Sequence, residues 1–197
     1  MKIIKGWDIQ RLSDLGEIVT GNTPSKKQSH YFGGDVPWVK PGDLDKFEDI
    51  VKTEEYLSDE GAKHARILPS HSVLVSCIGN LGKVGVAGRP LATNQQINAI
   101  VFSEKIFPRY GYYACRRLQR IMEHHAPATT LPIITKTRFS ELKIPVPPLS
   151  VQQKIASVLS TAESALEKRR QTLRLADDFL RSAFLEMFGE PGANPKG

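Results

Sequence analysis

The sequence predicts an α+β fold, with a mixed globular domain of short strands and helices followed by one long C-terminal helix. Apolar residues recur at helical spacing from residue 151 to about residue 187, and no Gly or Pro interrupts this run. Residues 1–149 instead contain short apolar runs separated by Gly, Pro and polar turn formers. We therefore expect a globular domain over 1–149, a long helix over 150–188 and a linker-like tail over 189–197.

The C-terminal helix carries a coiled-coil pattern, in which residues spaced alternately by four and three positions are apolar. Nine of the ten seam positions are apolar, and the exception is Arg169. A charged seam residue lowers stability but helps to define register. The positions are Ile155, Leu159, Ala162, Leu166, Arg169, Leu173, Ala176, Leu180, Ala183 and Met187.

Two interpretations of this helix are open. It could be an ordinary amphipathic helix that lies on its own domain. At 1.5 Å per residue, however, a helix over 151–187 would be about 55 Å long, whereas a small domain is about 30 Å across. We therefore expect a partner helix, from the same complex or from a second copy of the chain.

Composition limits the class of protein. The chain has 197 residues, of which 40% are hydrophobic and 24% are charged, and no apolar run is long enough to span a membrane. The first seven residues lack the apolar core of a signal peptide, so we expect a cytoplasmic protein without a membrane partner. Cys77 and Cys115 belong to no metal-like cluster, and we expect both to be buried and reduced.

The net charge of +6 is unevenly distributed. Residues 105–143 contain eight Lys or Arg and two Glu, a local charge of +6, whereas residues 43–60 contain eight acids and two Lys, a local charge of −6. The basic segment is a candidate phosphate-binding surface. On composition alone, a solvated charged face is an equally good interpretation.

The chain in order alternates strands and turns. We expect strands at 7–12, 36–40, 72–78, 97–102 and 142–149, a glycine-rich hairpin at 79–86, and a basic amphipathic helix at 108–123. A short helix or turn is expected at 13–19. The prolines at 147 and 148 predict a stiff joint to the long helix, with Ser150 as its N-cap.

Two polar segments could contact a ligand. Residues 20–31 form a polar loop rich in hydroxyl groups and basic side chains, suited to phosphate and base-edge contacts, and the alternative is a plain surface connection. For the amide-rich turn at 93–98 we favour a structural role over adenine recognition.

No catalytic constellation is evident. Glu141 and Lys143 have the Glu-x-Lys spacing of metal nucleases, but the upstream Asp of such a site is missing. The segment 147–149 lacks the Asn and aromatic residue of a base methyltransferase motif, and His124 and His125 do not share a helix face for metal binding. We therefore predict a binding protein, without catalytic residues, metal site or cofactor.

Taken together, these motifs resemble one family, the specificity subunits of type I restriction-modification systems. The resemblance spans nearly the whole chain, and its most specific feature is the double-proline joint into a long helix. It is carried by Lys5-Gly6-Trp7, Gly21-Asn22-Thr23-Pro24, Tyr31-Phe32-Gly33-Gly34, Val36-Pro37-Trp38-Val39, Ser76-Cys77-Ile78-Gly79-Asn80-Leu81-Gly82, Thr93-Asn94-Gln95-Gln96-Ile97-Asn98-Ala99-Ile100 and Ile144-Pro145-Val146-Pro147-Pro148-Leu149 followed by Gln152-Gln153. The sequence departs from the family at Gln152, where Glu is common, and at 128–130, where Gly-Ser-Thr is common.

The resemblance implies a non-catalytic DNA-recognition subunit. In this family a target recognition domain, here 1–149, reads one half of a split site in double-stranded DNA. A long spacer helix then pairs with a second helix and docks methyltransferase subunits, through which the restriction subunit joins the complex. We expect this chain to be one half-unit, either natural or part of a two-domain subunit, and to form an antiparallel homodimer or to pair with a second half of a longer subunit.

Candidate DNA-binding residues follow from this interpretation. Phosphate contacts are expected from basic side chains, namely Lys26, Lys27, Lys83, Arg89, Lys136 and Arg138. Base contacts are expected from polar loop side chains, namely His30, Tyr31, Asn80, Thr129 and Thr130. The alternatives are a coiled-coil adaptor whose globular domain binds protein, and a divergent metal-dependent nuclease.

Overall fold

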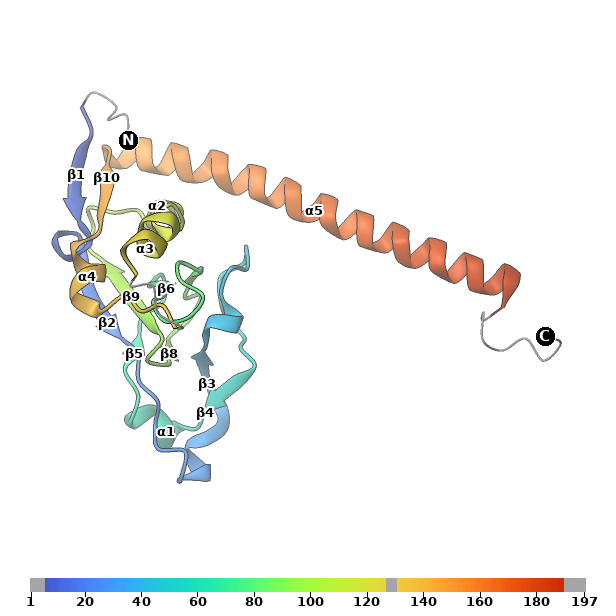
Figure 1. Ribbon diagram of the computed structural model, residues 1–197, viewed down its shortest axis with the longest axis horizontal. Helices are drawn as coiled ribbons and strands as arrows, with labels where there is room; N and C mark the ends of the chain where they lie inside the picture. The colour runs from blue at the N-terminus through green and yellow to red at the C-terminus, as the bar shows by residue number, and fades with distance from the viewer. Residues whose placement is uncertain (1–5, 127–130, 190–197) are drawn as a thin grey trace. The chain divides into compact units, whose positions relative to one another are not determined.

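The computed structural model describes residues 6–126 and 131–189 of the chain. The chain divides into two compact units, Met1–Ser157 and Val158–Gly197. The first unit contains every strand and most helices, and the second consists of helix within its described part. The predicted α+β class with a long C-terminal helix is therefore confirmed (Figure 1).

The main sheet is antiparallel, with strands in the order β2-β9-β6-β7. Its strands are β2 (Gly16–Thr20), β9 (Ile97–Phe102), β6 (Val73–Ser76) and β7 (Val84–Val86). The strand register places Ile18 opposite Ile100, Ile100 opposite Val73 and Val73 opposite Val86. This row of β-branched residues belongs to the largest hydrophobic cluster. Leu74, Ile97 and Ala99, which alternate with it along β6 and β9, belong to a second buried cluster, so both faces of the sheet are covered.

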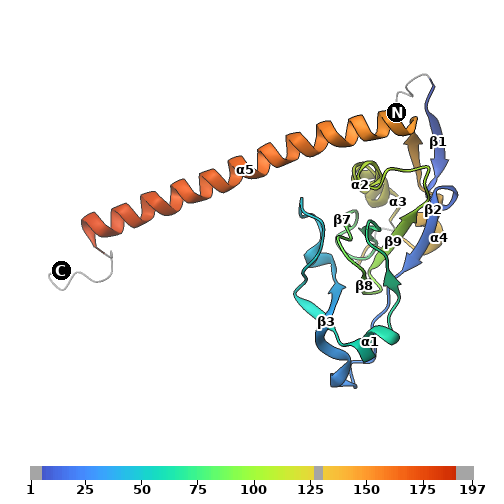
Figure 2. The same ribbon diagram turned by 180° about the vertical axis from the view of Figure 1, so that it is seen from behind.

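The second sheet is mixed, with strands in the order β4-β3-β8-β5. It comprises β4 (Glu55–Leu57), β3 (Phe32–Val39), β8 (Leu91–Thr93) and β5 (Ile67–Leu68), and only the β3–β8 pair is parallel. The short helix α1 (Asp59–Lys63) follows β4, and the Ser58 hydroxyl caps it by accepting a hydrogen bond from the Gly61 N–H. Figures 1 and 2 show α1 at the end of the domain that also holds β3 and β4.

Three helices pack with the main sheet. Helices α2 (Pro108–Arg116), α3 (Gln119–His125) and α4 (Lys136–Glu141) bury Tyr112, Met122 and Phe139 in the same cluster as the sheet. The sequence predicts one helix over 108–123, but the structure has two, because Arg117 and Leu118 form a turn between α2 and α3. There the N–H groups of both residues bond to carbonyls three positions earlier, so a tighter turn interrupts the α-helical hydrogen-bond pattern and separates α2 from α3.

The two ends of the domain are joined by a two-stranded sheet of β1 (Asp8–Arg11) and β10 (Lys143–Val146). Both strands were expected from the sequence. The short helix or turn expected at 13–19 is present as a 3₁₀ turn at Leu12–Asp14, but it is shorter than expected, because β2 begins at Gly16. Leu12 and Leu15 of the turn are buried in the main cluster with Ile18 of β2, and pairing of β2 with β9 fixes the rest of the segment as a strand.

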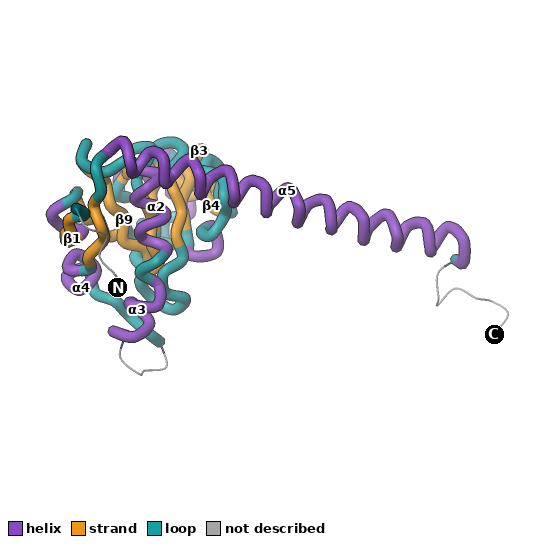
Figure 3. Tube along the Cα trace, turned by 90° about the horizontal axis from the view of Figure 1, so that it is seen from above, coloured by secondary structure: helices purple, strands orange, loops and turns teal. Residues whose placement is uncertain are grey.

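Helix α5 runs from Leu149 to Phe188 without interruption (Figure 3). The helix begins one residue before the expected N-cap, so Ser150 lies inside its first turn. The carbonyl of Pro148 accepts the N–H groups of Val151 and Gln152. Gln152 and Ala156 are buried in the first unit, so the start of α5 is part of the globular domain.

The predicted seam of α5 is largely exposed beyond Ser157. The large apolar side chains at its positions are from 40% to 70% exposed, namely Leu159, Leu166, Leu173, Leu180 and Met187. Arg169 is also exposed, and Ile155, in the first unit, packs against the main cluster. An uninterrupted helix with this much exposed apolar side chain has a surface suited to a partner.

Candidate nucleic-acid interface

The loop between β6 and β7 is shaped by two glycines in the left-handed region. Gly79 and Gly82 both have φ near +76°, a conformation that other residues adopt only with strain. Inside the loop, the Ser76 hydroxyl accepts a hydrogen bond from the Lys83 N–H at 2.9 Å. The Gly79 N–H donates to the Pro132 carbonyl at 3.0 Å, which ties the loop to the segment before α4.

Gly82 brings this loop directly against α3. A Cβ atom at Gly82 would lie 2.6 Å from the Cβ of Gln119, far inside a normal contact distance. Glycine is thus required both for the backbone conformation and for the close approach. The result is that the loop and the first turn of α3 form two sides of one cleft.

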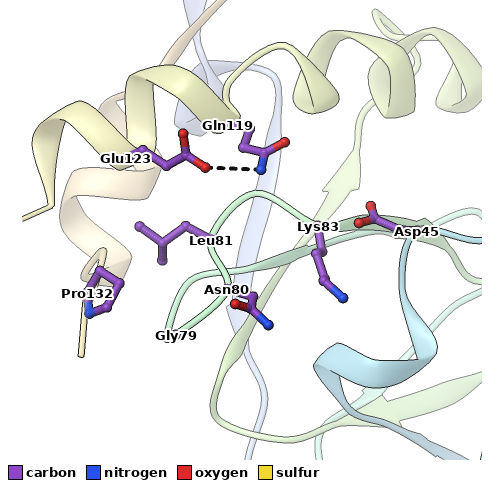
Figure 4. A pocket seen from close by; sticks show the side chains of 8 residues that line it. All are labelled: Asp45, Gly79, Asn80, Leu81, Lys83, Gln119, Glu123 and Pro132. Carbon is purple, nitrogen blue, oxygen red and sulfur yellow. Dashed lines mark hydrogen bonds between the residues drawn. The ribbon is translucent and has the colours of Figure 1, made fainter. Parts of the chain in front are cut away.

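This cleft has a volume of about 500 Å³ and a mixed polar lining. Figure 4 shows Gln119 and Glu123 projecting from α3 and Asn80 and Lys83 from the loop. The full lining is Asp45, Gly79, Asn80, Leu81, Lys83, Gln119, Glu123 and Pro132. The structure therefore brings together two of the predicted DNA-binding residues, Asn80 and Lys83.

The cleft contains several side chains with unused hydrogen-bonding capacity. The Gln119 amide N–H donates to Glu123 Oε1 at 3.0 Å, and Asp45 Oδ1 accepts the Val84 N–H at 3.0 Å. The side chains of Asn80 and Lys83 have no hydrogen bond or ion pair with any described residue. An amide, an ammonium group and carboxylate oxygens can together donate to and accept from base edges.

Helix α4 carries two more of the predicted residues. Lys136 and Arg138 are exposed, as expected for phosphate contacts. The Arg138 guanidinium also donates to the His125 carbonyl at 2.9 Å, at the end of α3. Arg138 therefore links α4 to α3 and has a structural role that the sequence did not predict.

A further group of predicted residues lies at the other end of the domain, beside α1. Lys26, Lys27 and His30 are exposed, and the Tyr31 ring stacks on His64 with ring centroids 4.6 Å apart. The Ser58 N–H donates to the Tyr31 carbonyl, which fixes this segment against α1. These residues are not brought into the cleft by the fold.

Part of the polar loop at 20–31 is structural. The Asn22 side chain donates to the His64 carbonyl and accepts the Arg66 N–H, and the indole N–H of Trp38 donates to the Asn22 carbonyl. The amide-rich turn is bonded to this loop and within itself, since the Thr23 hydroxyl donates to the Gln95 side chain and the Asn94 amide donates to that of Gln96. These bonds agree with the structural role favoured for that turn.

Arg89 and the pair Thr129 and Thr130 are the remaining predicted residues. Arg89 is exposed in the turn that follows Gly88. Because the Gly88 N–H donates to the Ile50 carbonyl, this turn lies beside the acidic segment, and Arg89 does not line the cleft. Thr129 and Thr130 lie outside the described residues.

The acidic and basic segments are connected by an ion pair. The Arg109 guanidinium, on α2, pairs with Asp49 and donates to the Phe47 carbonyl. Asp43 accepts the N–H groups of Lys40 and Glu54, so part of the acidic charge serves the fold. Most basic side chains of 105–143 stay exposed, namely Lys105, Arg116, Arg117, Arg120, Lys136, Arg138 and Lys143.

The nuclease alternative would need Glu141 and Lys143 to lie with further carboxylates around a metal ion. Glu141 ends α4 and Lys143 begins β10, and both side chains are exposed. In residues 6–126 and 131–189, no three His, Cys, Asp or Glu side chains gather as metal ligands. Within the same ranges, no helix has both the length and the apolar character needed to cross a membrane.

The sequence interpretation missed Asp45, Gln119 and Glu123 as members of the cleft. The spacing of Gln119 and Glu123 is a usable signal, because residues four apart share a helix face. Asp45 gave no local signal. It joins the cleft because its own N–H and carboxylate pair with Val84 in β7, a long-range contact.

A family model described as "Type I restriction modification DNA specificity domain" matches residues 4–174. The MjaIX specificity subunit of Methanocaldococcus jannaschii is 32% identical over 95% of this chain and 44% of its own length. The HindI specificity subunit of Haemophilus influenzae is 31% identical over 85% of this chain and 39% of its own length. The chain thus spans less than half the length of these type I restriction enzyme subunits.

Solved structures share the fold. A chain in a structure of a type I R-M system superposes with a TM-score of 0.72 at 22% identity, covering 94% of this chain and 46% of that chain. The HsdS subunit from Thermoanaerobacter tengcongensis gives a TM-score of 0.65 at 22% identity, covering 87% of this chain and 41% of that chain. At this level of identity the likeness concerns the fold alone.

Proposed function

Because this chain belongs to the type I restriction-modification DNA specificity family, we propose that it reads one half of a bipartite site in double-stranded DNA for a type I complex. It contributes sequence recognition, and the methyltransferase and restriction subunits contribute the chemistry. The observation that carries this proposal is the cleft between the β6–β7 loop and α3, where unpartnered Asn80 and Lys83 side chains lie among other polar groups.

The charge distribution supports DNA over a protein ligand. Specific DNA binding takes much of its affinity from Lys and Arg on phosphates. The adaptor alternative would be favoured by a buried basic segment, whereas the Arg and Lys side chains around α2, α3 and α4 are mostly exposed. Lys136 on α4 and Arg120 on α3 are candidates to bind the backbone on either side of bases read in the cleft.

The long helix suits the assembly role. We propose that the seam of α5 pairs antiparallel with a second α5, from another copy or from a second half of a longer subunit. Two recognition domains would then be related by a two-fold axis, which matches a split target. The same helix pair would dock methyltransferase subunits, and the complex would act in the cytoplasm, where its DNA substrate lies.

Two measurements test this function. The first is the mass of the purified chain by light scattering over a range of concentrations, for which a dimer near twice 21.9 kDa is expected. The second is binding to genomic DNA fragments with methyltransferase subunits present, followed by sequencing of the bound fragments. A common split sequence among them supports the proposal, and bound fragments without any common sequence would contradict it.

A further inference from the structure

Glu123 is an unusual residue for a DNA-binding surface, because it places a carboxylate on the exposed side of a basic helix. It has no ion pair with a described residue, although Arg120 and His124 lie on the same helix and Lys83 lines the same cleft. Among the described residues, its hydrogen-bond partner is the Gln119 amide nitrogen, which donates to Oε1 at 3.0 Å. A carboxylate facing phosphates weakens non-specific binding, so a specific contact is needed to offset this cost.

The Gln119 bond orients the carboxylate and leaves the second oxygen, Oε2, available. An ionised carboxylate can only accept hydrogen bonds. On the major-groove edge, cytosine itself carries only the N4 amino donor, whereas adenine carries the N6 donor next to its own acceptor N7. Guanine offers the acceptors O6 and N7, and thymine offers O4. An oriented carboxylate therefore favours cytosine and repels guanine and thymine.

The position of α3 is compatible with such a contact. The major groove is about 12 Å wide and admits one helix, and the exposed residues of α3 include Gln119, Arg120, Glu123 and His124. Gly82 keeps the loop against the first turn of α3, so Asn80 is presented beside this face. The loop and helix thus offer acceptor and amide groups to neighbouring base pairs.

We propose that Glu123, oriented by Gln119, is a specificity-determining residue that reads a cytosine of the half-site through its N4 amino group. This inference rests on the proposed DNA-recognition function and adds the chemical group that is read. Glu123 contacts the base, and Gln119 is a positioning residue that acts through it.

The test uses the complete protein together with its methyltransferase subunits in a host, with methylated sites mapped across the genome by sequencing. The variants are Glu123→Gln, which keeps the shape but removes the charge and adds a donor, and Gln119→Ala. The matched control is Glu17→Gln, which removes one exposed carboxylate from β2, outside the cleft. A melting curve of each purified variant establishes that it is folded.

The expected result is a split site with a C·G pair in wild type that becomes degenerate at that one position in Glu123→Gln. The loss of discrimination should be about 5- to 150-fold, as for one specific base contact. Gln119→Ala should relax the same position less, and Glu123→Asp, which keeps the charge, should retain part of the preference. Glu17→Gln should leave every position unchanged.

A folded Glu123→Gln variant with an unaltered site, or one altered at positions other than a C·G pair, would overturn the inference. That outcome leaves the proposed function intact, because a split site would still be methylated. If wild type itself methylates no defined split site, then the proposed function fails first.

Discussion

The Gln152 side chain accepts a hydrogen bond from the Phe107 N–H at 2.8 Å, joining the first turn of α5 to the start of α2. The same amide donates to the carbonyls of Lys105 and Pro147, both at 2.9 Å. Gln152 is only 1% exposed, so its oxygen and nitrogen are both satisfied by backbone groups in a buried site. The Gln152 side chain therefore connects the first turn of α5 both to Pro147, just before that helix, and to the segment 105–107, just before α2.

We expect Gln152→Ala to destabilise the first unit by about 2–4 kcal/mol, because it leaves a buried N–H and two carbonyls without their partner. Urea unfolding followed by tryptophan fluorescence measures this, since both Trp residues lie in that unit. Gln153→Ala is the matched control, as Gln153 is exposed on the same turn. Equal midpoints for the two variants would contradict the structural role of Gln152.

We expect Lys136→Ala combined with Arg138→Ala to weaken DNA binding and to lower the slope of log affinity against log salt by about 2, one unit for each phosphate contact. Binding titrations at several salt concentrations measure the slope. The control pair, Lys46→Ala with Lys52→Ala, removes the same charge from exposed positions in the acidic segment. If both double variants lower the affinity and the salt slope equally, then α4 does not contact the DNA phosphates.

Because Arg138 also bonds to the His125 carbonyl, the α4 variant needs a second readout. Its melting temperature provides this readout, because loss of the Arg138–His125 bond would lower the melting temperature, whereas loss of a phosphate contact would not. A reduced slope with an unchanged melting temperature assigns the effect to DNA binding.

We expect Leu173→Lys to raise the dissociation constant of the helix pair at least tenfold, because it places a charge in the apolar seam. Leu175→Lys makes the same change two residues later, off the seam, and should leave the dimer intact. The two leucines are 58% and 63% exposed, so neither change removes a contact inside the unit. Sedimentation at several concentrations distinguishes the variants, and equal loss of the dimer in both would reject the proposed seam.

We expect stability to fall at high pH. Burial raises the pKa of the Cys77 thiol from 9.0 to about 11 and that of the Tyr110 hydroxyl from 10.0 to about 12, and it also raises the pKa of Cys115 strongly. Each group thus favours the folded state most below its unfolded pKa, and this stability is lost as pH rises towards the folded pKa.

The urea midpoint should therefore stay level from pH 7 to 8.5 and decline from about pH 9 upwards. Cys77→Ala should make this decline shallower, because it removes one of the three titrating groups. A decline of equal steepness in wild type and Cys77→Ala would show that Cys77 does not contribute.

The candidate site was only partly visible in the sequence. Lys83 and Asn80 were identified because they lie in a glycine-rich turn of a recognisable hairpin. Asp45 was missed because it joins the cleft through a long-range pairing with Val84, which local patterns do not report. Gln119 and Glu123 share a helix face, but no local pattern shows that this face lies against the β6–β7 loop. Arg138 and the polar loop at 20–31 were expected to contact DNA, but Arg138 and Asn22 of that loop are each hydrogen-bonded to backbone groups of another segment.

By itself the sequence determined the elements whose signals are local. The uninterrupted 4-3 apolar spacing specified α5, the alternation of apolar runs and turn formers specified most strands, and the two prolines specified the joint before Leu149. These signals depend on neighbouring residues only, through helix propensity, strand geometry and the missing N–H of proline.

Only the tertiary structure decided what depends on contact between distant segments. It broke the basic helix at Arg117 and Leu118, where a tighter turn separates α2 from α3, and it set the β6–β7 loop against Gln119 through Gly82. It also paired Arg109 with Asp49 and placed Gln152 among three backbone groups. The physical reason is that packing and desolvation act between residues that are near in space, whatever their separation along the chain.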